Sequence, residues 1–335
     1  MWSQVHTQLS SLIDTLRSEF MTLHMPTPDA TFKIGTRGSP LALAQAHETR
    51  TRLMAAFELP ESAFEICVIK VTGDAVQDRA LREIGGKGLF TREIEEALLD
   101  GSIDIAVHSM KDMPVEQPDG LLLDTYLPRE DVRDAFVSFG ASSLNELEQG
   151  ATVGTSSLRR KAQLLARRPD LNVVEFRGNV QTRMKKLNDG VAMSTFLAMA
   201  GLNRLGMDHV PKAPIDPNDI LPAVAQGAIG IERRLADPRA EEMLAAIHDT
   251  PTGQRLAAER AFLAALDGSC ETPIAGLAEF DGDNLRLRGE ILREDGTEVL
   301  SDDATAPIED GAAMGKEMAK RLLSRAGPGF FSHRD

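Results

Sequence analysis

Strand and helix signals alternate along most of this 335-residue chain, from Phe32 to about Arg234. The run from Phe64 to Val71 is rich in β-branched residues, and the stretch from about Leu41 to Phe57 has the pattern of a long helix. A chain that alternates in this way folds into a largely parallel sheet with helices on its faces. The pattern therefore predicts an α/β architecture, and the length predicts two or three domains.

The pattern changes near Thr250. A helical stretch from Gly253 to Leu266 is followed by two hairpin turns, at 281–284 and 294–296, and by a closing helix at 312–325. These signals predict a small α+β domain. The small residues between Leu221 and Gly230 suit a crossover between domains. We expect domain 1 at 31–130 and 226–245, domain 2 at 131–225 and domain 3 at 246–335.

The first 30 residues form an N-terminal extension in this scheme. Apolar residues from Trp2 to Phe20 recur at helical spacing, but no basic stretch or continuous apolar run accompanies them. A signal peptide is therefore not expected. A loosely docked amphipathic helix, a disordered segment and an over-long start all remain open, since Met21 and Met25 also precede the first predicted strand.

Composition indicates a soluble cytoplasmic protein. The formal net charge is −14 and aromatic residues make up 4%, which disfavours nonspecific binding to nucleic acid or to an anionic membrane. No apolar run approaches the roughly 18 residues of a membrane span. Cys67 and Cys270 are too few for a disulfide framework, and without Cys/His clustering we expect no metal site.

The window from Thr152 to Lys186 is strongly basic, although the chain as a whole is acidic. Between Thr152 and Lys186 only Asp170 and Glu175 are acidic, whereas the basic residues are Arg159, Arg160, Lys161, Arg167, Arg168, Arg177, Arg183, Lys185 and Lys186. A solvated helix face is the simple explanation. However, small and hydroxyl-bearing residues at 154–157 precede a predicted helix at 161–167, and free N–H groups at a helix start favour an anion. The window thus predicts a site for a ligand with several negative charges.

Ligands of open α/β sheets bind beyond the carboxyl ends of strands. The candidates at such positions are Arg37, Ser39, Lys87, Ser109 to Asp112, Thr155 to Arg160, Arg177 and Arg183. Asp112 is the carboxylate among these cations. It could form a surface ion pair with Lys111, but it follows an apolar strand and precedes Pro114, which places it at a rigid strand end. There it could stabilise positive charge or transfer protons.

Cys270 is the second candidate for chemistry. A buried inert thiol is the common fate of such a residue. Its position in a tight loop between Gly268 and Pro273 instead indicates an accessible sulfur that could form a covalent bond.

Several strings together resemble the hydroxymethylbilane synthase family, also called porphobilinogen deaminases. They occur in order from about Phe32 onwards, at 34–42, 86–90, 108–114, 129–136, 154–160, 177–183, 200–206 and 268–270. The resemblance implies two α/β lobes like those of periplasmic binding proteins, with the active cleft between them. The cysteine loop would reach in from a third domain.

The resemblance also implies an activity. Family members condense four porphobilinogen molecules into the linear tetrapyrrole hydroxymethylbilane and release ammonia. The chain grows on a dipyrromethane cofactor, joined here to Cys270 by a thioether. Asp112 would be the catalytic carboxylate that assists ammonia loss and stabilises cationic intermediates. Each pyrrole carries an acetate and a propionate, so many carboxylates must be bound, and a cytoplasmic monomer is implied.

The implied roles fall on two groups of residues. The cofactor would be held by Lys87, Ser109, Lys111, Asp112, Thr155, Ser157, Arg159 and Arg160. The substrate and the growing chain would be held by Arg37, Ser39, Arg177, Gly178, Arg183, Arg204 and Gln226. The chain departs from the family pattern at Glu83, where a lysine is frequent, and at 193–195, where an Asp-small pair usually begins a strand.

Two other functions fit parts of the sequence. A noncatalytic two-lobed binding protein for a polyanionic small molecule would share the fold. The Asp112 and Cys270 pair favours the enzyme over that alternative. A nucleic-acid-binding regulator could use the basic window, but the acidic balance and scarce aromatics disfavour it.

Overall fold

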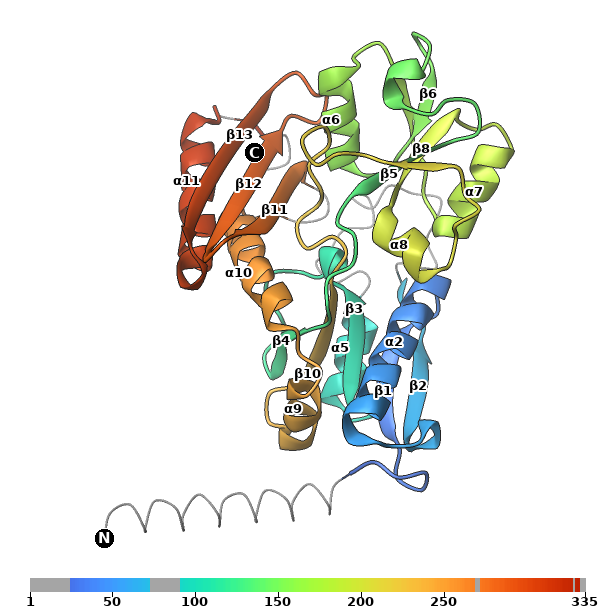
Figure 1. The fold of residues 1–335 in the computed structure, drawn as a ribbon, viewed down its shortest axis with the longest axis vertical. Coiled ribbons are helices and arrows are strands. Elements are labelled where there is room, and N and C mark those ends of the chain that lie inside the picture. Colours follow the sequence, from blue (N-terminus) through green and yellow to red (C-terminus); the bar gives the residue numbers. More distant parts are fainter. Residues whose placement is uncertain (1–24, 73–90, 269–271, 328, 332–335) are drawn as a thin grey trace.

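The computed structural model describes residues 25–72, 91–268, 272–327 and 329–331. In this part of the chain, three sheets each form the centre of a lobe (Figure 1). Two lobes hold five-stranded sheets flanked by helices, and the third holds three strands flanked by two helices. The predicted α/β architecture with a small C-terminal α+β unit is confirmed.

The first lobe has strand order β2-β1-β3-β10-β4. Strands β1, β2 and β3 run parallel, and β10 lies antiparallel between β3 and β4. Its elements are β1 (Phe32–Arg37), α2 (Pro40–Phe57), η1 (Glu61–Ala63), β2 (Phe64–Ile69), α5 (Arg92–Leu99), β3 (Ile105–Ser109), η2 (Met110–Asp112), β4 (Leu121–Tyr126), β10 (Ile229–Arg234) and α9 (Pro238–Ala245).

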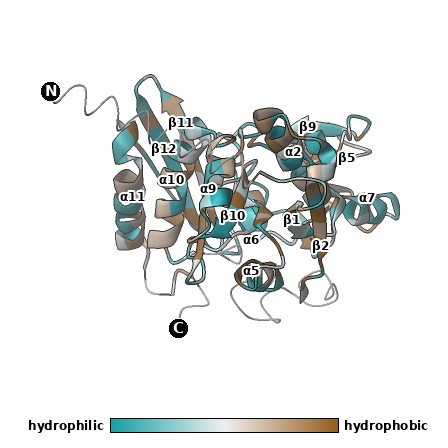
Figure 2. Ribbon diagram, turned by 90° about the horizontal axis from the view of Figure 1, so that it is seen from below, coloured by the Kyte–Doolittle hydropathy of each residue, from teal (hydrophilic) through white to brown (hydrophobic). Residues whose placement is uncertain are grey.

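The second lobe has strand order β7-β6-β8-β5-β9, with β5 antiparallel to both of its neighbours. Its elements are β5 (Asp134–Ser138), η3 (Leu144–Glu146), β6 (Thr152–Gly154), α6 (Leu158–Arg167), β7 (Asn172–Val174), α7 (Val180–Asn188), β8 (Ser194–Ala198), α8 (Met199–Arg204) and β9 (Lys212–Pro214). The departure at 193–195 leaves a regular strand, since β8 begins at Ser194. In Figure 2, β2 of the first lobe is largely hydrophobic, whereas α7 faces outward and is largely hydrophilic.

The third lobe is an antiparallel meander with two helices. Its elements are α10 (Thr250–Ala265), β11 (Ile274–Asp281), β12 (Asn284–Leu292), β13 (Val299–Pro307), η4 (Ile308–Asp310) and α11 (Gly311–Arg325). Both predicted hairpin turns are present, and Gly282 and Gly296 supply the positive φ that each turn needs.

Serine side chains cap the N-termini of α2 and α6. The Ser39 hydroxyl accepts a hydrogen bond from the Ala42 N–H at 3.2 Å, and Pro40 begins α2. Ser157 caps α6 in the same way. Helix α6 therefore begins at Leu158, three residues before the predicted start, which places Arg159 and Arg160 in its first turn.

The lobes are joined by buried polar contacts. Arg129, just after β4, forms a fully buried ion pair with Glu259 of α10, with Nη1 and Oε1 2.6 Å apart. Glu259 also accepts hydrogen bonds from the backbone N–H groups of Ala225 and Ala278. One carboxylate of the third lobe thus connects the first lobe, the crossover segment and β11.

We expect Glu259→Gln to lower the free energy of unfolding by about 3–5 kcal/mol, because it leaves the Arg129 guanidinium buried without its counterion. Urea denaturation measures the change. The matched control is Glu96→Gln, which removes an exposed pair with Arg92 and should cost less than about 1 kcal/mol. Equal losses in the two variants would contradict this role of Glu259.

Candidate functional site

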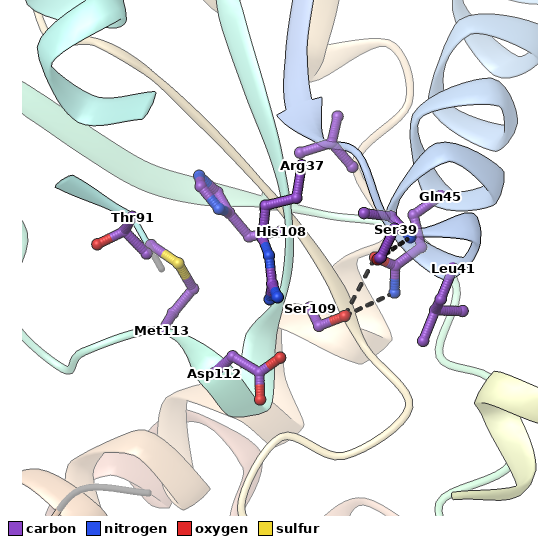
Figure 3. Close-up of a pocket in the computed structure, with 11 residues that line it drawn as sticks. Arg37, Ser39, Leu41, Gln45, Thr91, His108, Ser109, Asp112 and Met113 are labelled. Carbon is purple, nitrogen blue, oxygen red and sulfur yellow. Dashed lines mark hydrogen bonds between the residues drawn. The ribbon is translucent and has the colours of Figure 1, made fainter. Parts of the chain in front are cut away.

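A pocket opens at the carboxyl ends of β1 and β3. These neighbouring parallel strands end at the same edge of the sheet, so the residues that follow them meet there. Figure 3 shows the side chains that surround the pocket. The lining residues are Arg37, Ser39, Leu41, Ala42, Gln45, Thr91, Val107, His108, Ser109, Asp112 and Met113. The predicted grouping of Arg37, Ser39, Ser109 and Asp112 therefore exists in the structure.

Two pocket residues are fixed by partners that the sequence analysis missed. The buried Gln45 amide donates to the Ser109 hydroxyl at 2.8 Å and accepts from it at 3.1 Å. His108 turns its Nε2 to the buried Glu232, 3.1 Å from Oε2. Neither partner has a local sequence signal, because Gln45 reaches from α2 and Glu232 from β10.

Asp112 is exposed at the pocket while its neighbours are not. It ends η2, directly after β3, and Met110 and Met113 on either side are buried. The two buried methionines hold the turn in place while the Asp112 carboxylate stays exposed. This agrees with the expectation of a fixed carboxylate at a strand end, although a turn of 3-10 helix separates Asp112 from the strand.

A second group of residues is centred on Asp134, at the start of β5. Its buried carboxylate accepts from Arg159 Nη2 at 2.8 Å, Arg160 Nη2 at 2.7 Å and Gln226 Nε2 at 2.9 Å. Burial alone would raise the pKa of Asp134, but the two guanidinium groups hold it well below its usual range. Asp134 therefore stays negatively charged and gathers two arginines of α6.

Arg159 and Arg160 keep unused hydrogen-bonding capacity. Their Nη atoms also donate to the carbonyls of Leu221 and Phe196, at 2.8 and 2.9 Å. The Nε atom of each is buried and has no partner among the described residues. Before α6, the Thr155 hydroxyl accepts from the Ser157 N–H at 3.2 Å and shapes the turn.

Lys111 links this group to the pocket. Its Nζ donates to Gln226 Oε1 at 3.5 Å, and the other end of that amide donates to Asp134 and to the Val132 carbonyl. Burial of the amine, and then the nearby Arg160, lower the pKa of Lys111 to about 8, although Asp112 and Asp134 oppose them. The buried Gln226 amide has hydrogen-bond partners at both its oxygen and its nitrogen. It connects Lys111 to Asp134.

Arg183 lies within electrostatic reach of the same residues. Burial and then the charge of Arg160 lower its pKa to about 10, while Asp112 raises it. Its Nε donates to the carbonyl of Gly178 at 2.9 Å, and Gly178 has φ of +117°. Gly178 therefore has a positive φ, a backbone conformation that favours glycine, in the loop from Arg177 to Asn179.

Arg204 lies apart from these residues. Its Nε donates to Glu48 of α2 at 3.2 Å and its Nη1 to the Gly227 carbonyl at 3.1 Å. These bonds join the first and second lobes. Arg204 is not among the residues that line the pocket, and its expected contact with substrate stays a prediction.

Lys87, Cys270 and the departure at Glu83 lie outside the described residues. Within the described ranges, no group of three or more His, Cys, Asp or Glu side chains is placed to hold a metal ion. No helix there has the length and apolar character that a membrane span requires.

Comparison with known proteins gives a consistent set of relatives. The family model described as "Porphobilinogen deaminase, dipyromethane cofactor binding domain" matches residues 32–242, and "Porphobilinogen deaminase, C-terminal domain" matches residues 254–324. Over 307 residues the chain is 67% identical to the porphobilinogen deaminase of Paracoccus denitrificans (strain Pd 1222). That match covers 92% of this chain and 98% of the relative.

More distant similarity extends to solved structures. An ABC transporter periplasmic substrate-binding protein from Coxiella burnetii is 14% identical, with a TM-score of 0.40 over 66% of this chain and 94% of that one. The periplasmic VFT2 domain of BvgS from Bordetella pertussis is 14% identical, with a TM-score of 0.41 over 74% of this chain and 97% of that one.

The amine of Lys111 is expected to titrate near pH 8 in protein without ligand, so it carries its charge below that pH and loses it above. Carbon-13 methylation followed by NMR measures the midpoint, with the signal assigned by its loss in Lys111→Arg. Asp112→Asn should lower the midpoint, because the Asp112 charge raises the pKa of Lys111. Binding of a polycarboxylate should raise it. A midpoint at the ordinary lysine value would contradict this account.

Proposed function

The chain belongs to the porphobilinogen deaminase family, and we propose that it is the transferase that condenses four porphobilinogen molecules into hydroxymethylbilane with release of ammonia. The observation that carries this proposal is the grouping of several cations around one exposed carboxylate, within the segment that the family model matches. A noncatalytic binding protein is not favoured, since both family models and the curated relative are those of the enzyme.

The residues present fit a dipyrromethane cofactor. The buried Nε atoms of Arg159 and Arg160 have no partner among the described residues, and the Lys111 amine makes a long hydrogen bond to Gln226, so donors remain for carboxylates. Lys111, Thr155, Ser157, Arg159 and Arg160, with Ser109, would hold the cofactor, and Lys87 would join them from outside the described residues. When bound through Cys270, the cofactor supplies the primer on which the product is assembled.

The substrate side of the proposal rests on Arg37, Arg177 and Arg183. Arg37 lines the pocket with Ser39, and Arg183 adjoins the loop that contains Gly178. Guanidinium groups bind carboxylates in a fixed geometry, so these side chains would orient the acetate and propionate of porphobilinogen. Gln226 and Arg204 contribute indirectly, as a bridge to Lys111 and as a connection between lobes.

Asp112 would act on the reacting atoms. Loss of ammonia from the aminomethyl group leaves positive charge on the substrate, and a fixed carboxylate next to it stabilises that charge. The same oxygen atoms can hold the proton that the pyrrole carbon later releases.

Sheet membership supports the proposed division into domains 31–130 with 226–245, 131–225 and 246–335, because β10 and α9 pack in the first lobe. We propose further that the enzyme is a cytoplasmic monomer. Membership of the family that the two models match supports this proposal.

Intact-protein mass tests the cofactor assignment. Protein purified from cells is expected to exceed its sequence mass by two pyrrole units, because a thioether survives denaturation. Cys270→Ser should remove the excess, whereas the control Cys67→Ser should retain it. A wild-type mass equal to that of the bare chain, in an active preparation, would refute covalent attachment.

Asp112→Asn tests the catalytic assignment. It keeps the shape and removes the charge, so it should retain the cofactor while turnover of porphobilinogen falls about 100-fold or more. Asp119→Asn, an exposed carboxylate in the loop that follows, is the control and should keep normal turnover. Rapid hydroxymethylbilane formation by the Asp112→Asn enzyme would rule out the proposed role.

A further inference from the structure

Arg260 of α10 makes an unusual contact with the segment that follows Asp112. Its Nη2 donates to the carbonyl oxygen of Pro114 at 2.8 Å and to that of Val115 at 3.2 Å. None of the ion pairs among the described residues includes Arg260, and burial lowers its pKa. Arg260 is half-buried, and its guanidinium binds two carbonyl oxygens there in place of a carboxylate, which indicates a role beyond packing.

Helix α10 and the turn that carries Asp112 contribute to one apolar cluster. Met110 and Met113 are 1% and 4% exposed, and they lie in the same apolar cluster as Leu256 and Phe262 of that helix. Asp112 itself stays exposed between them. Its position is therefore set by flanking residues that are packed against the third lobe, although Asp112 belongs to the first.

Glu259, the residue before Arg260, fixes the segment that contains Ala225 and Gln226. Glu259 accepts from the N–H of Ala225 at 2.7 Å and holds that residue at φ of +60°, a strained value for alanine. The next residue, Gln226, contacts Lys111 and Asp134. Two consecutive residues of α10 thus hold both segments that form the site, and Cys270 follows the end of this helix by five residues.

We propose that Arg260 is a positioning residue that sets the place of the Asp112 carboxylate by binding the carbonyls of Pro114 and Val115. This inference rests on the proposed function. It assigns Arg260 no contact with substrate. Its effect is transmitted through the backbone between residues 112 and 115, and a shift of about 1 Å there is enough to slow the reaction.

The first test compares variants of cofactor-loaded enzyme. Arg260→Met keeps much of the apolar stem and removes both hydrogen bonds, so kcat should fall roughly 10- to 100-fold, with KM and cofactor mass close to wild type. Arg260→Lys, which can still reach one carbonyl, should give an intermediate kcat. Arg255→Met is the control, because Arg255 lies on the same helix and bonds to Pro251 and Thr252 of that helix.

The second test is a double-mutant cycle with Asp112→Asn. If Arg260 acts through the Asp112 carboxylate, Arg260→Met should change the residual rate of the Asp112→Asn enzyme by less than about twofold. An equal fold-loss in both backgrounds, or an Arg260→Met enzyme that melts earlier with kcat unchanged, would overturn the proposal. Wild-type protein that makes no hydroxymethylbilane would instead overturn the proposed function and this inference with it.

Discussion

The buried carboxylate of Asp134 is the interaction on which the candidate site depends. It begins a strand of the second lobe, yet it gathers two arginines of α6 and the amide of Gln226 from the crossover segment. Without this anion, two guanidinium groups would be buried close to each other and to Lys111. Burying these like charges without a counterion would strongly destabilise the fold. With it, the cations can be concentrated in one place and still leave donors for a ligand.

The same arrangement would allow an acidic protein to bind the proposed polyanionic ligand. The net charge of −14 is spread over the surface, whereas the cations near Asp112 are partly removed from water. Charges interact more strongly in that environment, so a local excess of positive charge dominates over distant acidic residues. Burial, and then the nearby charge of Arg160, lower the pKa values of Lys111 and Arg183, and a ligand with several carboxylates would offset that charge.

Much of the fold and part of the site could be predicted from the sequence. Strand and helix periodicity predicted the α/β lobes, and the rule that ligands bind at strand ends brought Arg37, Ser39, Ser109 and Asp112 together. Contacts between residues far apart in sequence could not be predicted: Gln45 with Ser109, Asp134 with Gln226, and Arg129 with Glu259. The bonds of Gln226 to Lys111 and of Arg204 to Glu48 could not be predicted either, and the expected ligand contacts of Gln226 and Arg204 stay predictions. Cys270 and Lys87 stay predictions.

The position of β10 has a consequence for how the chain is made. This strand pairs with both β3 and β4 in the first sheet, yet it is encoded after the whole second lobe. During synthesis, β3 and β4 are made first, and about 100 further residues are added before β10, the strand that lies between them. Until then, the edges of β3 and β4 that pair with β10 have no partner strand. The first lobe therefore cannot complete its sheet ahead of the second, and a truncated gene ending after β4 would not encode a finished lobe.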